Sequence, residues 1–295
     1  MYFGFEPLVI AQMTLGAIAD ISFAIALGAT LLGFGARPRA LTIRVALLVW
    51  LFAQIAYLLT QASVMADTPI LASWSSVMPV IRESHFGSMW RIGLGAGIVA
   101  FVLACVVEGE RASGLVARAC LVGAFAVMAF THAGTTHAAD AGDFSVAECV
   151  HALHLWTTAA WGGVVISAAW PLKKVFQPWS TQTLRDLRNV SWIATLTFAI
   201  AIGTGLANAW RELGGALAPL TSSAWGQLLC TKLVVVGVVV TIGTINRLAH
   251  LAHRRAIDRP TLTIVMRLLS IEAVLMVIVL SVASVLGHSI PAAVA

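Results

Sequence analysis

Eight long apolar segments constrain the fold of this chain more than any other feature. They cover residues 8–33, 41–63, 88–107, 115–135, 146–170, 189–211, 225–247 and 264–287. A helix of about 20 apolar residues crosses the hydrocarbon core of a bilayer, which is about 30 Å thick. No alternation of apolar and polar residues competes with these segments as a strand signal. The sequence therefore predicts an all-α, polytopic membrane helix bundle with about eight transmembrane helices.

The composition supports a membrane protein and argues against several soluble classes. Of the residues, 59% are hydrophobic and only 11% are charged, whereas about 25% of a soluble domain is charged. The net charge of +5 does not indicate nucleic-acid binding, because the basic residues lie in short loops rather than in one stripe. The Gly203-Thr-Gly205 segment lacks the lysine of a phosphate-binding loop, so no nucleotide is expected. We expect one transmembrane domain over residues 1–295, with the lipid bilayer as its surroundings.

The lysines and arginines set the expected orientation. The chain has 18 lysines and arginines. The loops and span ends on one side of the membrane hold Arg82, Arg91 and Arg211, and Lys232 lies inside a span. The loops of the other side hold the remaining 14: Arg37, Arg39, Arg44, Arg111, Arg118, Lys173, Lys174, Arg185, Arg188, Arg247, Arg254, Arg255, Arg259 and Arg267. Basic loops face the cytoplasm, so both termini are predicted to lie outside.

The segment at residues 146–170 carries the most unusual polar residues for a membrane span. Ser145 is a predicted N-cap, and Glu148 completes a capping box three residues later. His151 and His154 follow, one turn apart and therefore on one helix face. Ionisable side chains in a membrane rarely face lipid, so we expect this face to point into the protein or into an aqueous cavity. Two histidines at this spacing can also hold a metal ion.

The short loop before this segment brings further metal ligands to the same end of the bundle. His132, His137 and Cys149 are predicted to converge there with the two histidines, and Met128 lies one turn below His132. Imidazole suits copper, zinc, iron and nickel, while thioether and thiolate favour Cu(I). The mixed set therefore favours copper, and Cu(I) over Cu(II). The alternative is that the loop histidines are merely solvated.

Two further groups of residues are candidates for a function: a second set of metal ligands and three charged residues within spans. His85 and Met89 are spaced i, i+4 at the mouth of the third segment and form a second candidate set of ligands. Asp20, Lys232 and Glu272 lie within spans, where each charge costs about 3 kcal/mol. We expect the three to line a transport path, with Lys232 and Glu272 as a suggested pair. For Lys232, snorkelling to the outer interface is the competing interpretation.

A series of motifs in residues 145–250 is similar to the copper resistance protein D family. The motifs are His151-x-x-His154, Trp161-Gly-Gly, Gly203-x-Gly205-x-x-Asn208, Trp225-Gly226-x-x-Leu229-x-x-Lys232 and Asn246-Arg247. The resemblance implies a multi-pass protein of the bacterial inner membrane that handles copper at the periplasmic side. It also implies a separate periplasmic copper carrier of the copper resistance protein C type as a partner. It makes Lys232 and Asn246 part of the family pattern, and Asn246 joins the expected path.

The leading interpretation is a copper-binding protein that takes copper at the outer His/Met site and moves it towards the cytoplasm. No Ser-His-Asp order, HExxH motif or carboxylate pair indicates an enzyme. A haem-binding, cytochrome b-like oxidoreductase is the alternative, with His132 and either His151 or His154 as axial ligands. A third interpretation is a structural protein that docks a periplasmic copper protein.

Overall fold

A computed structural model describes residues 7–33, 37–106, 115–176, 181–251 and 257–289. Within these ranges eight helices are long and apolar enough to cross a membrane, and no strand occurs. The long helices are α1 (Pro7–Leu31), α2 (Arg37–Ala66), α4 (His85–Val106), α5 (Leu115–Ala133), α6 (Val146–Ala169), α8 (Thr181–Glu212), α10 (Ala224–Ile245) and α11 (Arg259–Gly287). The predicted membrane helix bundle is confirmed.

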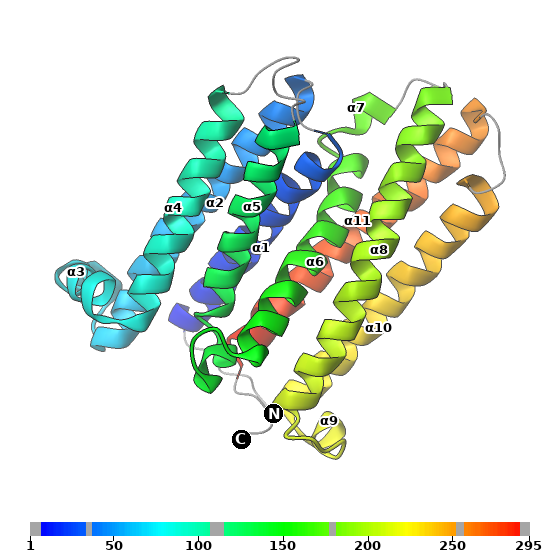
Figure 1. The fold of residues 1–295 in the computed structure, drawn as a ribbon. Helices are drawn as coiled ribbons and strands as arrows, with labels where there is room; N and C mark the ends of the chain where they lie inside the picture. Colours follow the sequence, from blue (N-terminus) through cyan, green and yellow to red (C-terminus); the bar gives the residue numbers. More distant parts are fainter. Residues whose placement is uncertain (1–6, 34–36, 107–114, 177–180, 252–256, 290–295) are drawn as a thin grey trace.

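Short elements complete the connections between the long helices. They are η1 (Ile70–Ala72), α3 (Trp74–Glu83), η3 (His137–Ala141), α7 (Lys173–Phe176), α9 (Pro219–Ser222) and η4 (Asn246–Leu251). The last is a π-helical turn that continues α10. Helices α3 and α9 lie at one end of the bundle (Figure 1). We call this the outer end, after the predicted orientation.

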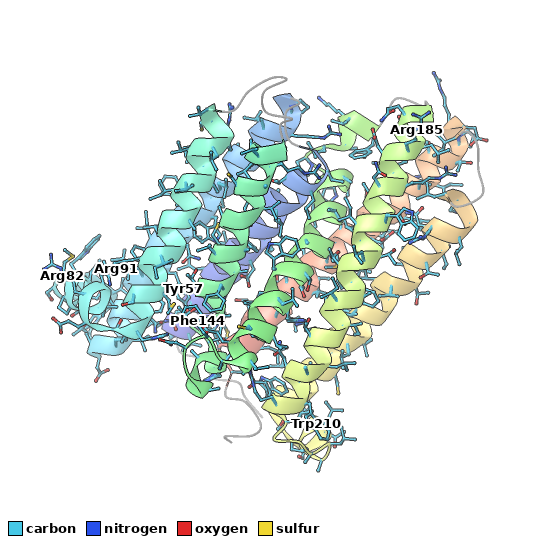
Figure 2. All side chains as sticks on the ribbon, viewed as in Figure 1. Tyr57, Arg82, Arg91, Phe144, Arg185 and Trp210 are labelled. Carbon is cyan, nitrogen blue, oxygen red and sulfur yellow. The ribbon has the colours of Figure 1, made fainter. Side chains whose placement is uncertain are left out.

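The charged loops are divided between the two ends as the sequence suggests. Arg82, Arg91 and Trp210 lie towards the outer end, and Arg185 lies at the opposite end (Figure 2). The bundle thus separates the arginine-poor end from the arginine-rich end. Which end faces the cytoplasm stays a prediction from the lysine and arginine count.

Helices α1 and α6 form the centre of the bundle. α1 packs on α2, α5, α6 and α11, and α6 packs on α1, α5, α8 and α11 (Figure 1). Consequently 61% of the apolar 18-residue stretch of α6 is buried inside the protein, whereas only 11% of the corresponding stretch of α10 is buried. The helix that carries the two histidines is therefore surrounded by protein.

Small residues allow α1 and α6 to cross with their backbones in contact. A Cβ atom added at Gly163 would overlap the carbonyl oxygen of Ala24, and one added at Gly28 would overlap the backbone of Gly163. Membrane helices lack a hydrophobic force between them and associate through such close packing of small residues. This crossing holds α6 in place along the core of the bundle.

The start of α6 is fixed as the sequence predicts. Ser145 is the N-cap, and its Oγ accepts a hydrogen bond from the Glu148 amide at 3.2 Å. Glu148 reaches back one residue further than a standard capping box, and its Oε2 accepts from the Phe144 amide at 2.5 Å. Glu148 is fully buried against Gly134, which ties the α5–α6 loop to the helix.

Candidate functional site

A cavity of about 250 Å³ lies in the outer half of the bundle, and all eight long helices contribute to its wall. We call it the outer cavity. Its polar and ionisable lining residues include Asp20, Tyr57, His132, His137, His151, His154, Asn208, Glu212, Lys232 and His288. The wall also contains the thioether of Met128. The predicted gathering of histidines at the outer end is thus present, around one cavity.

His151 and His154 lie together on the wall that α6 provides. Their ring centroids are 6.4 Å apart, and the ring planes make an angle of 39°. Metal–nitrogen bonds are about 2.0 Å long, so the pair can share one ion when a nitrogen of each ring points into the space between the two rings. The i, i+3 spacing on a helix produces this placement without any contribution from loops.

A backbone hydrogen bond fixes the orientation of His154. Its Nδ1 lies 3.0 Å from the carbonyl oxygen of Ala201 and 3.3 Å from Thr204 Oγ1, both on α8. A carbonyl only accepts, so Nδ1 carries the hydrogen and donates, and Nε2 keeps its lone pair. Metal-binding histidines usually donate from one ring nitrogen in this way and bind with the other.

His151 has an unsatisfied polar atom. Its Nδ1 is buried and has no hydrogen-bond partner within the described residues. Two other residues of the same cavity wall also have a buried polar atom without a hydrogen-bond partner among the described residues. These atoms are Thr158 Oγ1 and Asn208 Nδ2. Buried polar groups in native proteins nearly always have a partner, and exceptions point to water or an ion. The wall of the outer cavity thus carries polar groups from α6 and α8 that do not pair with one another.

Gly205 determines whether His154 can hold this position. A Cβ atom added at Gly205 would lie 2.8 Å from His154 Cε1, whereas one added at Gly203 on the same helix meets nothing within 4 Å. If His154 is a ligand, Gly205→Ala should weaken Cu(I) binding by about 10–100-fold, the usual cost of disturbing a ligand's support. Gly203→Ala should leave the affinity unchanged. Competitive Cu(I) titration of both purified variants checks this, and equal affinities would contradict the assignment.

The opposite wall of the cavity carries a second group of polar residues. Asp20 Oδ1 lies 3.6 Å from His132 Nδ1. Tyr57 donates its hydroxyl hydrogen to Nε2 of His288 at 3.0 Å, because Nδ1 of His288 already donates to the Ser284 carbonyl at 2.8 Å. Asp20 also lies within electrostatic range of His288 and Lys232. The Asp20 carboxylate thus lies near three basic side chains, His132, His288 and Lys232.

Neither His288 nor Tyr57 was predicted from the sequence as part of the site. The two residues are 231 positions apart and meet only through packing of the helices. The signal in the sequence was the presence of a histidine directly after a span.

Three predicted ligands lie outside the wall of the outer cavity. Cys149 is exposed, and its thiol contacts the Phe144 carbonyl. His85 donates from Nε2 to the Gly134 carbonyl at 3.0 Å, and its Nδ1 lies 3.7 Å from Asp143. Met89 packs against Gly134. His85 and Met89 therefore attach α4 to the α5–α6 loop and do not extend the histidine pair.

The described residues contain no group of three or more His, Cys, Asp or Glu side chains arranged to hold a metal ion. His137, although it lines the cavity, has its Nδ1 3.4 Å from Asp140 in its own turn. The predicted convergence of the loop histidines and Cys149 with the α6 pair into one ligand set is thus not observed. The donor set that remains is the His151 and His154 pair. Two imidazoles suit Cu(I), which accepts low coordination numbers.

A second cavity of about 270 Å³ lies in the other half of the bundle, between α6, α8, α10 and α11. We call it the inner cavity. Glu272 lines it and accepts a hydrogen bond from Asn246 Nδ2 at 3.3 Å. Lys232 instead lines the outer cavity. The suggested Lys232–Glu272 pair is wrong, because the two residues lie at different depths and each faces a different cavity.

Two family models match the chain. The model of copper resistance protein D matches residues 184–286, and that of the copper resistance protein D-like N-terminal domain matches residues 8–146. Among curated proteins, inner membrane protein YebZ of Escherichia coli (strain K12) is 31% identical over 97 residues, 33% of each chain. Copper resistance protein D of Pseudomonas syringae pv. tomato is 25% identical over 197 residues, 64% of this chain and 63% of the relative. The chain thus spans less than two thirds of either relative, and no solved structure matches it.

Proposed function

The chain belongs to the copper resistance protein D family, and we propose that it is a multi-pass inner-membrane protein that carries copper. On this proposal copper enters the outer cavity, binds between His151 and His154, and moves towards the cytoplasm. The role is binding and transport, without catalysis. The inner-membrane location is supported by the eight apolar helices and by the similarity to the inner membrane protein of Escherichia coli.

The observation that carries this proposal is the state of the two imidazoles. The Ala201 carbonyl orients His154 so that Nε2 keeps its lone pair, and the buried Nδ1 of His151 has no hydrogen-bond partner in the part of the chain that the structure describes. The centroids of the two imidazole rings are 6.4 Å apart. A pair of half-buried imidazoles, in a cavity wall that also contains other polar side chains, is suited to bind a cation that prefers nitrogen ligands.

Several features favour Cu(I) as the form that is carried. The α6 pair provides two nitrogen ligands, and the Met128 thioether in the same wall is a soft ligand. A thioether is not protonated at neutral pH and so retains copper without competition from protons. Asp20 adds a carboxylate to the wall, which also contains Lys232, whereas Glu212 is paired with Arg211 at 2.6 Å.

The direction of transport and the partner follow from the expected orientation. Since the arginine-rich end is predicted to face the cytoplasm, the outer cavity would face the periplasm. We propose that a separate periplasmic copper carrier of the copper resistance protein C type delivers copper there. The haem alternative gains no support from the family models or from the relatives.

An optical titration of the purified, reduced protein with Cu(I) against a chromophoric competitor tests this function. We expect one Cu(I) ion to be taken up per protein, and no Soret band in the starting spectrum. A Soret band would favour the haem alternative. Absence of both signals would contradict copper binding and favour a docking role.

A further inference from the structure

The outer and inner cavities lie in line along the same four helices. On α6, Thr158 lines the outer cavity and Trp161 lines the inner cavity. On α11, Leu280 lines the outer cavity and Glu272 lines the inner cavity. Helices α8 and α10 also line both cavities. The two cavities thus occupy successive parts of the space between these four helices, one in each half of the bundle.

Met276 lies on α11 between the residues that line the two cavities. On α11 it lies one turn from Glu272 and one turn from Leu280, so it stands midway between the two cavities. Its side chain is fully buried and belongs to neither cavity wall. Trp161 and Phe198, whose ring centroids are 4.9 Å apart, belong to the wall of the inner cavity.

The backbone of α6 leaves room for this methionine. A Cβ atom added at Gly162 would lie 2.8 Å from the Met276 methyl group. The neighbouring Gly163 serves the crossing with α1, so the two glycines have separate roles. The methionine therefore lies directly against the helix that carries the histidine pair.

The inner cavity has acceptor groups that suit a cation. Asn246 Oδ1 is buried without a hydrogen-bond partner, and no basic side chain forms an ion pair with Glu272 among the described residues. The other charged residue of this wall, Arg247, bonds Thr195 at 2.6 Å and stacks on Trp192. Asn246 also begins the π-helical turn, a distortion that is frequent at functional sites.

We propose that Met276 is a Cu(I) ligand at the constriction between the two cavities, and that Glu272 and Asn246 receive the ion in the inner cavity. The inference rests on the proposed copper transport. A thioether is soft and uncharged, so it binds Cu(I) while adding no charge to the centre of the membrane. The Glu272 carboxylate then compensates the charge of the ion, which the apolar surroundings of the cavity cannot do.

The test uses full-length protein in proteoliposomes that contain a chromophoric Cu(I) chelator, with Cu(I) added outside. Met276→Leu keeps the volume but removes the sulfur, and we expect about tenfold slower transfer, equivalent to about 1.4 kcal/mol in the barrier. Cu(I) affinity at the outer cavity should stay as in the wild type, which also shows that the variant is folded. The matched control is Met266→Leu, a buried methionine on the same helix that lines neither cavity, and it should transfer at the wild-type rate.

The outcomes separate this inference from the proposed function. If Met276→Leu transfers Cu(I) at the wild-type rate, Met276 is only a packing residue and the inference is overturned. If the wild type binds no Cu(I) or transfers none, the proposed transport fails and the inference fails with it. Equal slowing by Met266→Leu would indicate a general packing effect and would also overturn the assignment.

Discussion

Replacing His151 and His154 together with alanine should abolish high-affinity Cu(I) binding. Loss of a group that supports a metal ligand typically costs 10–100-fold in affinity, so loss of both ligands should cost at least about 100-fold. His154 bonds to Ala201 and Thr204, but α6 is held mainly by its packing on α1, α5, α8 and α11, so the fold should survive without the imidazoles. Competitive titration of purified protein against a Cu(I) chromophore measures the change.

Cys149→Ala is the matched control for this experiment. Cys149 belongs to the same helix but is exposed and lies outside the cavity wall, so its replacement should not change Cu(I) affinity. The single variants His151→Ala and His154→Ala should each show an intermediate loss. Unchanged affinity in the double variant would remove the pair from the site, and a large loss in Cys149→Ala would place the ligands on the other face of α6.

Gly163→Ala should be strongly destabilising, although it adds only one methyl group. The added Cβ would overlap the Ala24 carbonyl of α1, and backbone atoms at a helix crossing cannot rotate away as a side chain does. Overpacking costs typically 1–3 kcal/mol, and we expect about 3 kcal/mol here. In detergent, the thermal unfolding midpoint should fall by roughly 5–10 °C.

Gly237→Ala in α10 provides the comparison for the Gly163 variant. A Cβ atom at Gly237 meets nothing within 4 Å, so the substitution adds only the helix propensity of alanine and should leave the midpoint unchanged or slightly higher. Equal midpoints for both variants would show that α1 and α6 do not cross with their backbones in contact.

The helices could be predicted from sequence because each apolar segment is long enough to cross a bilayer. The largest difference is at α8, which begins at Thr181, eight residues before the predicted span at 189–211. Its first turns are polar and include Arg185 and Asp186, so hydropathy alone could not assign them to the helix. The side of the membrane that each end faces stays a prediction.

The site was predictable where local geometry decides it. His151 and His154 share a face because a helix turns by about 100° per residue, and the structure places them together on the cavity wall. The same geometry puts Cys149 about 200° from His151, on the far side of the helix. Cys149 was included among the predicted ligands for its chemistry and its proximity in sequence, neither of which determines the face of a helix.

Contacts between distant segments could not be predicted from sequence. The Tyr57–His288 hydrogen bond depends on how α2 and α11 approach each other at the outer cavity. The pairing of His132 with Asp20 similarly depends on the packing of α1 beside α5. The suggested Lys232–Glu272 pair required helix tilt or water to close the gap in depth between the two residues, and the packed helices leave them at different cavities.

X-ray absorption at the copper edge of the complex with one Cu(I) ion per protein tests the central claim most directly. The claim predicts scattering from two imidazole nitrogens at about 2.0 Å, and loss of this signal in the His151→Ala, His154→Ala variant. A first shell dominated by sulfur, or an imidazole signal that persists in the variant, would contradict copper binding by this pair.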